Sequence, residues 1–512
     1  MESSNCQVLV GSQQLQKERN VCVLVDTGSV NSCFLPAFIS PVEYDILKKR
    51  TSFTGLSGAS MTYCKIVDGV FCSVFFIGIG YKDTKCICKT VLALQQAVGI
   101  MIRLSEKEKL DAILCVDNSY AKELLSVSEV IKNIASSAIL ANYEFVTFFT
   151  IESKKNKKNC TVKIYCPEES AKVLYDDAVH KGFVAAQSTN NARVWCDMPP
   201  CHFYPEVFAK QAVELLSEEK TITCKVLHKK ELEEIKAGGI LAVGGGSAFQ
   251  PCMVVAEYVP KNGYSKTIAL VGKGVTFDTG GISIKPADNM EDMKDDMAGA
   301  AVVLNSLSAL AKLECPYRII ACAPMVENMP SGSAFRPGDI VTFYNGKTAE
   351  IKNTDAEGRL ILADALSYVA DKYKPDAICD FATLTGACAV AVGPFFAAVM
   401  TQYEKLAEDF IKAGKHSGDR CWQLPLDDAF KPAVESDVAD VCNIGKRQYK
   451  AGTITAGWFL KAFVPEAMPW IHVDIASVAF HPVNKSYLRS SGASGFGVRL
   501  CLELLSTKQY FN

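Results

Sequence analysis

The sequence lacks a strong net charge, although charged side chains are plentiful. Its 54 lysine and arginine residues nearly balance its 56 aspartate and glutamate residues, which leaves a net charge of −2. Proteins whose main partner is nucleic acid or an anionic membrane are usually basic. The composition therefore favours a peptide or a small molecule as the ligand, and neither nucleic acid nor membrane is expected as a partner.

The cysteines lack the spacing of a zinc finger or of a disulfide framework. The chain has 21 of them, an odd number, and no two form a C-x-x-C pair; Cys86 and Cys88 lie closest in sequence. Cys322 and Cys379 lie within apolar runs, where a reduced cysteine packs as a small hydrophobe. This distribution is typical of a reducing compartment, so we expect a cytoplasmic protein.

Signals for secretion and for a membrane span are also missing. Residues 1–20 have no basic segment followed by an apolar stretch of adequate length. Residues 381–403 carry no charge and are long enough to cross a bilayer, but they contain three threonines and a central Pro394. We expect a strand, a loop and a buried core helix in this stretch.

The length of 512 residues suggests two large domains, at roughly 150 residues or more per domain. We predict a smaller N-terminal α/β domain at 1–165, a linker helix at 166–197 and a catalytic domain at 198–512. Three prolines within 197–206 mark the start of the last domain. In the first domain, strand patterns cover 21–26, 69–79, 143–151 and 160–166, and helical patterns cover 105–115 and 119–136. The polar tract 152–159 is expected to be a solvated loop that joins two strands.

The second half of the chain alternates apolar strand runs with amphipathic helices. The strand runs are 267–272, 318–324, 376–382 and 471–476, and helices are predicted at 297–313 and 359–373. Strands that are apolar throughout indicate a sheet covered on both faces. The fold class is therefore α/β, with a central, largely parallel sheet covered by helices. In such sheets, function gathers at the ends of the strands.

Two segments at predicted strand ends concentrate charge among glycines. Lys273, Asp278 and Lys285 lie within 271–301, just after the first strand run. Asp355 and Glu357 lie within 353–366, and in an extended segment their spacing places both carboxylates on one face.

Clustered carboxylates stay ionised in a low-dielectric site only with compensating cations. Lysines supply part of that charge, and divalent Mn²⁺, Mg²⁺ or Zn²⁺ would supply the rest. For an isolated D-x-E pair, a solvated turn or a helix cap is the more common explanation. The six histidines are far from both segments in sequence, and no H-E-x-x-H occurs, which excludes a histidine-based zinc protease.

Several motifs together resemble one family. NTDAEGRL at 353–360 is similar to the signature octapeptide of the leucine aminopeptidase family, the cytosolic dinuclear metallo-exopeptidases. VGKGVTFDTGGISIK at 271–285 resembles the second metal-site segment of that family. Further matches follow in family order at 327–339, 382–387, 451–464 and 492–499. The resemblance covers about residues 190–505.

The resemblance implies a ligand set for two divalent ions per subunit, Zn²⁺ and/or Mn²⁺. One ion would be bound by Lys273, Asp278, Asp296 and Glu357. The other would be bound by Asp278, Asp355 and Glu357, with the backbone carbonyl of Asp355. For Asp296 alone, the N-cap of the following helix is the ordinary alternative.

The resemblance also implies the reaction and its other residues. A metal-activated hydroxide would release amino acids, preferably Leu-like or other apolar ones, from peptides with a free N-terminus. Lys285 would stabilise the oxyanion, and Arg359 would hold a bicarbonate that shuttles the proton. Met293, Ala476 and Leu384 would bind the substrate, although helix packing explains Met293 almost as well. A homohexamer is implied as the assembly.

Some features depart from the family pattern, and other function classes stay open. Asp295 stands where alanine is common, and Ala298 replaces a more usual glycine. The N-terminal 165 residues match the family only in general pattern. The alternatives to an active peptidase are a DNA-binding regulator, known among bacterial relatives, or a structural scaffold that retains the fold.

Overall fold

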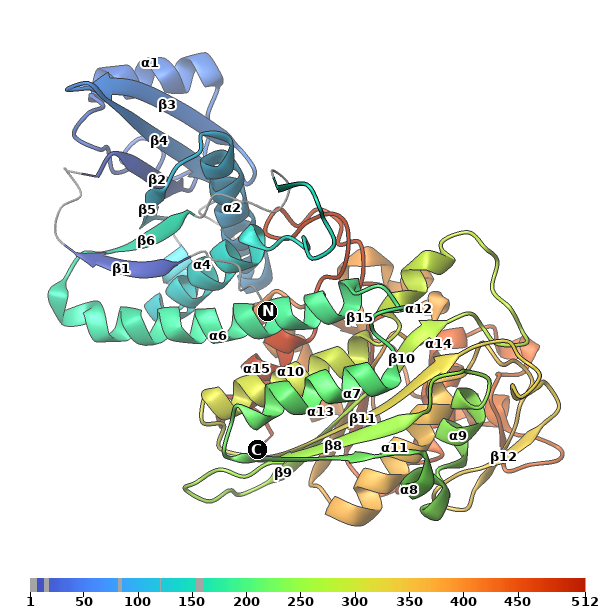
Figure 1. The fold of residues 1–512 in the computed structure, drawn as a ribbon. Helices are drawn as coiled ribbons and strands as arrows, with labels where there is room; N and C mark the ends of the chain where they lie inside the picture. The colour runs from blue at the N-terminus through green and yellow to red at the C-terminus, as the bar shows by residue number, and fades with distance from the viewer. Residues whose placement is uncertain (1–6, 13–17, 82–84, 120, 153–159, 512) are drawn as a thin grey trace. The chain divides into compact units, whose positions relative to one another are not determined.

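The computed structural model describes residues 7–12, 18–81, 85–119, 121–152 and 160–511 (Figure 1). The chain divides into two compact units. Unit 1 contains Met1–Gln187, Lys415–Gly418 and Asn484–Ser490, and unit 2 contains Ser188–Gly414, Asp419–Val483 and Ser491–Asn512. The domain limits expected from the sequence, with a linker helix at 166–197, stay a prediction.

Unit 1 is built on a six-stranded sheet with the order β1-β6-β5-β2-β4-β3. Neighbouring strands are parallel except β3 and β4, which form a hairpin. Asp68 and Gly69 join these two strands, and both have positive φ, as a two-residue hairpin turn requires. The strands are β1 (Val8–Ser12), β2 (Asn20–Val25), β3 (Ser60–Val67), β4 (Val70–Gly78), β5 (Ala112–Asn118) and β6 (Thr161–Cys166).

Helices of unit 1 pack on both faces of its sheet. One face contributes to an apolar core with α2 and α4, and the other packs with Tyr44 of α1. Ser40 and Ser126 each begin a helix with a reciprocal capping box, to Glu43 and Glu129 respectively. The helices are α1 (Pro41–Thr51), α2 (Ile87–Lys107), α3 (Ala121–Leu124), α4 (Val127–Asn142) and the start of α6 (Lys172–Asp197).

Two predictions for unit 1 are wrong. The helix expected at 105–115 is instead the end of α2, a turn and the start of β5, because Lys109 adopts a left-handed conformation that stops the helix. The strand expected at 143–151 forms no strand, and Phe148, Phe149 and Ile151 are exposed. An apolar run becomes a strand only where a neighbouring strand can pair with it. The loop expected at 152–159 lies almost entirely outside the described residues.

One described helix, α2, is long and apolar enough to cross a membrane by length and composition alone. More than half of its apolar stretch is buried inside the protein, as in the core helix of a soluble protein. Residues 381–403 contain the end of β14 (Ala377–Ala382), α12 (Gly386–Val392), η4 (Gly393–Phe395) and β15 (Ala397–Met400). The prediction of a buried core helix in this stretch is wrong, since α12 is short and Val390 is 89% exposed.

The main sheet of unit 2 has the order β16-β15-β18-β14-β9-β11-β8-β7, with β10 paired to β11. The central strands β18, β14, β9 and β11 are parallel to one another. The pairs β11–β8, β8–β7 and β15–β18 are antiparallel. The four strands predicted from apolar runs are present as β9, β11, β14 and β18. The strands are β7 (Ile222–Leu227), β8 (Cys252–Tyr258), β9 (Thr267–Gly272), β10 (Gly274–Asp278), β11 (Arg318–Asn328), β14 (Ala377–Ala382), β15, β16 (Cys421–Gln423) and β18 (Trp470–Asp474).

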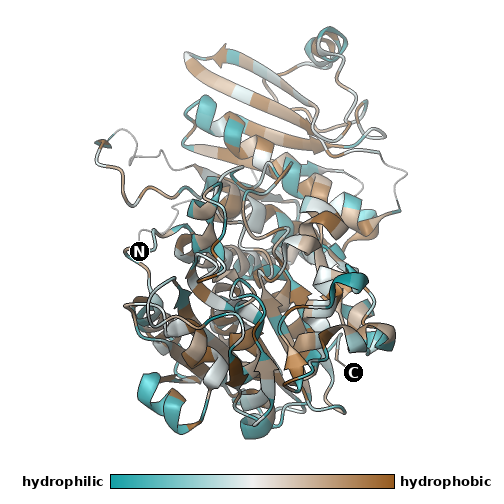
Figure 2. Ribbon diagram, turned by 90° about the vertical axis from the view of Figure 1, so that its right-hand side faces the viewer, coloured by the Kyte–Doolittle hydropathy of each residue, from teal (hydrophilic) through white to brown (hydrophobic). Residues whose placement is uncertain are grey.

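Helices cover both faces of this sheet, which confirms the predicted α/β class. α10 packs against α7, α15 and the central strands, and α11 packs against α9, α14 and the same strands. Ala269 and Val271 of β9 belong to the core beneath α11, while Ile268 and Leu270, equally buried, alternate with them. Figure 2 shows hydrophobic segments along the strands. The helices are α7 (Pro205–Ser217), α8 (Lys229–Glu234), α9 (Gly238–Gly244), α10 (Ala298–Lys312), α11 (Gly358–Tyr373), α13 (Glu404–Ser417), α14 (Gly452–Lys461) and α15 (Val498–Leu505).

The carboxyl ends of the parallel strands place the polar residues. Lys273 follows β9, Asp278 ends β10, Asn328 ends β11, Thr383 follows β14, and Asp474 ends β18. A small sheet of β12 (Ile340–Thr342), β13 (Thr348–Glu350) and β17 (Val441–Cys442) leads into the loop at 351–357. Parallel strands end at one edge, so residues far apart in sequence meet there.

Candidate metal centre

The first half of the site is centred on Lys273. Its Nζ atom lies 2.7 Å from Asp296 Oδ1 and 2.9 Å from Glu357 Oε1, and it donates a hydrogen bond to the Thr383 carbonyl at 2.8 Å. All three charged side chains are buried. Asp296 also accepts a hydrogen bond from the Thr383 hydroxyl at 2.8 Å. Asp296 lies between η3 (Met290–Asp295) and α10, where the sequence placed it.

The second half is centred on Lys285. Its Nζ atom lies 2.7 Å from Asp278 Oδ2 and 2.5 Å from Asp355 Oδ1. The other oxygen of Asp278 accepts hydrogen bonds from the Gly280 amide and from Asn328 Nδ2. Lys285 is 21% exposed, so it is the more open of the two lysines. The segment between them contains β10, where the sequence indicated only a glycine-rich turn.

The loop that carries Asp355 and Glu357 is a turn, not the extended segment expected. The Ala356 amide donates to the Asn353 carbonyl, and Asn353 Oδ1 accepts the amide of Asp355. The buried side chain of Asn443, from a distant segment, holds this turn in place. It accepts a hydrogen bond from the Lys352 amide and donates one to the Asn353 carbonyl. The two carboxylates still converge, but through the turn and not through a shared strand face.

A glycine gives Lys273 room to reach Glu357. A Cβ atom added at Gly358 would lie 2.4 Å from Lys273 Cε and 2.6 Å from Nζ, closer than Cβ atoms approach neighbouring atoms. The glycine after Glu357 in NTDAEGRL therefore has a steric role. It lets the lysine side chain pass across the start of α11.

The carboxylates form a group that suits a cation. Asp278, Asp355 and Glu357 each offer an oxygen within 4.8 Å of the others. Within the described residues, Asp296 Oδ2 and Glu357 Oε2 are buried and have no hydrogen-bond partner. Buried carboxylate oxygens without partners are costly unless a cation compensates them. Hard and borderline divalent metals accept such oxygen ligands, so the residues fit a metal-binding acidic cluster.

The pKa values follow the crowding of charge. Burial raises the pKa of Asp278 and of Asp296, and the neighbouring Glu357 carboxylate raises both further. Burial disfavours the charged form of Lys273, but the carboxylates of Asp296 and Glu357 outweigh it and raise the pKa of this lysine. Lys285 follows the same pattern, with Asp278 as its main partner. In the metal-free site, both lysines are therefore ammonium ions that partly neutralise the acids.

Arg359 is the second residue of α11 and is buried. Its Nη1 donates to the Asn443 carbonyl at 2.7 Å, while Nε is buried without a hydrogen-bond partner in the part of the chain that the structure describes. Burial lowers the pKa of Arg359 to about 10, partly opposed by Glu357 and Asp474, so the side chain is still a cation at neutral pH. The guanidinium can accept an anionic ligand at Nε.

Two of the three expected substrate-binding residues meet at Asp474. Its Oδ1 accepts the amide of Leu384 at 3.2 Å and the amide of Ala476 at 3.1 Å, and its Oδ2 accepts the Thr385 hydroxyl. Asp474 is fully buried, whereas Leu384 and Ala476 are half-buried. Met293 is half-buried in η3, three residues before Asp296.

Sequence reasoning missed the residues that hold the site together. Asp474, Asn328, Asn443 and Thr383 contact the predicted residues directly through hydrogen bonds. Asp474 has a visible signal, since it is a charge within an apolar strand run, and a charge there requires partners. The two asparagines have no such signal, because a single amide after a strand is common in ordinary turns.

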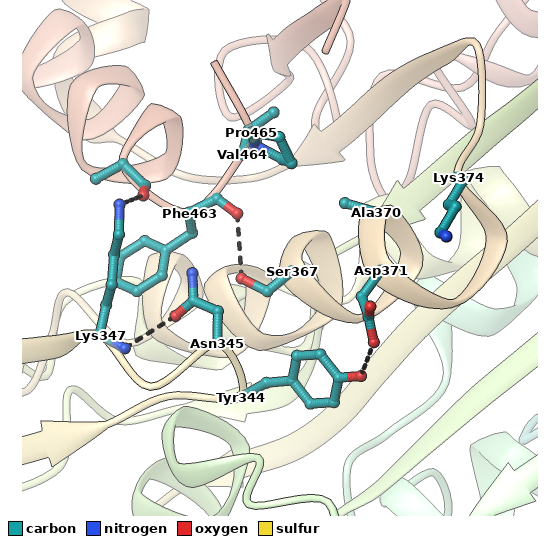
Figure 3. A pocket seen from close by; sticks show the side chains of 11 residues that line it. Tyr344, Asn345, Lys347, Ser367, Ala370, Asp371, Lys374, Phe463, Val464 and Pro465 are labelled. Carbon is teal, nitrogen blue, oxygen red and sulfur yellow. Dashed lines mark hydrogen bonds between the residues drawn. The ribbon is translucent and has the colours of Figure 1, made fainter. Parts of the chain in front are cut away.

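A separate cavity of about 650 Å³ lies in unit 2 (Figure 3). It is lined by Tyr344 and Lys347 of one turn, by Ser367 and Asp371 of α11, and by residues 462–465 after α14. Asp371 accepts a hydrogen bond from the Tyr344 hydroxyl, and Ser367 donates to the Phe463 carbonyl. None of the predicted site residues lines this cavity.

Comparison with known proteins agrees with this geometry. Residues 190–502 match the model of the cytosol aminopeptidase family, catalytic domain. A probable cytosol aminopeptidase of Chlorobaculum tepidum is 46% identical over 355 residues, which is 69% of each chain. One of Chloroherpeton thalassium is 40% identical over 464 residues and covers 88% of this chain and 89% of its own. These relatives are named for the cytosol, in agreement with the location that the cysteines predict.

Solved structures give the same assignment across nearly the whole chain. The bottromycin maturation enzyme BotP in complex with Mn superposes with a TM-score of 0.82 at 31% identity, over 95% of this chain and 98% of that one. A second structure of BotP gives a TM-score of 0.80 at 30% identity. With the signature segments, the acidic cluster and the fold in agreement, the chain belongs to the cytosol aminopeptidase family of metallopeptidases.

Proposed function

We propose that the enzyme binds two divalent ions, Zn²⁺ and/or Mn²⁺, and releases apolar N-terminal residues from peptides. The observation that carries the proposal is the pairing of each lysine with two carboxylates. Lys273 joins Asp296 to Glu357, and Lys285 joins Asp278 to Asp355. The expected ligands thus form two adjacent groups. The structure of BotP in complex with Mn supports a divalent ion as the cofactor of this chain as well.

The ligand roles follow from the chemistry of each side chain. Lys273 would ligate as a neutral amine, since a metal replaces the proton that Asp296 and Glu357 now stabilise. Asp278 and Glu357 are the most buried acids of the group of three and would bridge the two ions. The ions, when bound, would polarise the scissile carbonyl and lower the pKa of water.

Lys285 would act on the reacting carbonyl and not on the metal. It is partly exposed, and its amine lies between Asp278 and Asp355 at the open side of the cluster. Once metal neutralises these acids, the ammonium group would be free to donate to a developing oxyanion. A cation held ready at this position needs no rearrangement during the reaction.

Arg359 would hold the anion that moves the proton. Among the expected catalytic residues no histidine or unligated carboxylate is present to act as the base, and the Nε atom of Arg359 has an open donor position. Bicarbonate fits the planar guanidinium and could accept the proton. Stimulation of the bicarbonate-depleted enzyme by added bicarbonate, lost in Arg359→Ala, tests this role.

Leu384, Ala476 and Met293 would form part of the pocket for the first side chain of the peptide. These residues are apolar and half-buried, and Asp474 fixes the backbones of two of them. Such a lining favours Leu-like residues by the transfer of apolar area from water.

The test is hydrolysis of a panel of aminoacyl amides, with metal content measured on the same samples. We expect leucyl and methionyl amides to be the best substrates and activity to require Mn²⁺, Zn²⁺ or both. An N-acetylated leucyl peptide should be inert, because acetylation removes the amine that would ligate metal. Cleavage of the acetylated peptide at a comparable rate, or full activity with less than one metal per subunit, would contradict the proposal.

We also propose a homohexamer as the assembly, on the family resemblance, with light scattering as the test; a monomer mass would overturn it. The DNA-binding alternative would use the N-terminal domain, and the near-neutral net charge of −2 argues against it. A gel shift with salt titration distinguishes it, since phosphate contacts weaken steeply with salt.

A further inference from the structure

The sulfur atoms of Cys86 and Cys88 lie 3.1 Å apart in unit 1. Cys86 is the N-cap residue of α2 and has an extended backbone, and Cys88 is in the first turn of the helix. A disulfide bond is about 2.05 Å long, so the two sulfurs need to approach by roughly 1 Å to bond. Both side chains are half-buried, which leaves them within reach of a small reagent.

The surroundings of Cys86 favour its thiolate. Contact with the Cys88 thiol, followed by the backbone amide of Lys89 and the lysine charge, lowers the pKa of Cys86 below its ordinary value. Thiolates, not thiols, attack disulfides. The Cys86 sulfur, which would attack first, and the Cys88 sulfur, which would attack second, are therefore already in contact.

Comparison with other cysteines shows that two properties occur together in the Cys86–Cys88 pair. Cys22 and Cys115 face each other across β2 and β5, but both are buried, and burial raises the pKa of Cys22 well above its ordinary value. Cys64 and Cys201 are exposed but lie far in sequence from Cys86 and Cys88. The Cys86–Cys88 pair has both a neighbouring sulfur and access from solvent.

We propose that Cys86 and Cys88 are a redox-active dithiol that a low-molecular-weight disulfide of the glutathione type converts to an intramolecular disulfide. The Cys86 thiolate attacks one sulfur of the reagent, whose S–S bond breaks and releases one thiolate. Cys88 then loses its proton and attacks Cys86 Sγ, which releases the second thiolate. The protein loses two electrons and two protons, and the reagent gains them as two thiols.

Peptide mapping of the full-length protein tests the proposal directly. Cleavage after Lys85 and Lys89 releases both cysteines in one peptide, Cys86–Lys89. After incubation with oxidised glutathione and alkylation of the remaining thiols, we expect this peptide without alkyl groups and lighter by two hydrogen atoms. Dithiothreitol should restore the dithiol form.

Variants separate the two steps. Cys88→Ser should retain a glutathione adduct on Cys86, because no second thiol removes it, whereas the parent protein should lose that adduct. Cys86→Ser should leave Cys88 as a thiol at the same oxidant concentration. Circular dichroism and aminoacyl amide hydrolysis check that both variants are folded.

Cys201 is the matched control, since its thiol is exposed and its first product with oxidised glutathione is a mixed disulfide. The proposal is wrong if the Cys86–Lys89 peptide stays a dithiol at concentrations that modify Cys201. It is equally wrong if Cys88→Ser gives no adduct on Cys86. Neither outcome depends on the peptidase activity, so the test stands apart from the proposed function.

Discussion

Units 1 and 2 use acidic residues at strand ends in different ways. In unit 1, Asp26 follows β2 and accepts the amides of Gly28 and Ser29, so it orders the loop that follows the strand. Asp117 at the end of β5 lies 3.5 Å from Lys122. In unit 2, Asp278 ends β10 in the same manner, but it faces Asp355 and Glu357.

The difference shows that an acid at a strand end is not enough to make a metal site. Asp26 has backbone donors of its own loop and Asp117 has Lys122 beside it, whereas Glu357 belongs to a group of three carboxylates and keeps a buried oxygen without a hydrogen-bond partner among the described residues. Excess negative charge without donors creates the demand for a cation. Substitution of acidic or charged residues in either unit tests this difference.

The largest effect is expected from Glu357→Gln in unit 2. The amide removes a charged ligand shared by both proposed ions and leaves Lys273 with one fewer carboxylate. We expect kcat/KM to fall by more than about 10³-fold and bound metal to decrease. Steady-state kinetics and metal analysis measure both. Asp26→Asn in unit 1 is the control, and a similar loss in that variant would contradict the comparison.

Lys285→Ala should lower kcat by roughly 10²–10³-fold, the effect of losing one oxyanion donor. Metal content should stay unchanged, since this lysine is proposed to act on the carbonyl oxygen. Kinetics and metal analysis on one preparation decide between the roles. Stoichiometric loss of metal would make Lys285 a ligand instead.

Asp474→Asn should change substrate preference more than metal binding. The amide keeps the oxygen that accepts the backbone amides of Leu384 and Ala476 but loses the oxygen that accepts the Thr385 hydroxyl, so the segment that carries Leu384 is held less firmly. Loss of such a buried hydrogen bond costs about 1–3 kcal/mol, and we expect the kcat/KM ratio of leucyl to alanyl amide to fall about tenfold. Asp380→Asn, a buried acid on the neighbouring strand β14, is the matched control. An equal change in its ratio would assign the effect to general loosening of the fold.

Metal affinity should rise with pH through neutrality. The pKa of Lys273 is raised in the metal-free site, so this lysine is protonated at neutral pH and must lose its proton to ligate. Apparent affinity should therefore rise by about tenfold per pH unit for each proton released. Calorimetry in buffers of different ionisation enthalpy measures the protons. In Lys273→Met, the rise of metal affinity with pH should be less steep by the one proton that Lys273 releases. An equally steep rise would exclude Lys273 as the source of that proton.

The smallest effect belongs to unit 1. A hydrogen bond from His416, with those of Ser126, lowers the pKa of Glu129 to about 2. A lowered pKa stabilises the fold above the ordinary value near 4.5, and the contribution is lost as the pH falls towards 2. Urea unfolding should show that the parent protein loses more stability than Glu129→Gln between pH 5 and pH 3, by less than about 1 kcal/mol for this partly exposed pair. Parallel losses in the two proteins would show that Glu129 contributes nothing.

The order of elements in unit 2 was readable because its strands are apolar throughout and its helices have a regular period. The same reasoning failed at 143–151, where an apolar run has no strand to pair with, and at 105–115, where Lys109 ends the helix. It also failed for α12, whose apolar composition did not lead to burial. Local patterns report what a segment can form, but pairing and burial depend on neighbours elsewhere in the chain.

The sequence by itself determined the α/β class, the strand ends that carry charge and, through NTDAEGRL, the family. Only the tertiary structure decided that Lys273 reaches Glu357 across Gly358, that Asp355 and Glu357 converge through a turn, and that Asp474 joins Leu384 to Ala476. These are contacts between segments that are distant in sequence. Their geometry is set by the common edge of the parallel sheet and by the need of each buried charge for a partner, neither of which a local pattern contains.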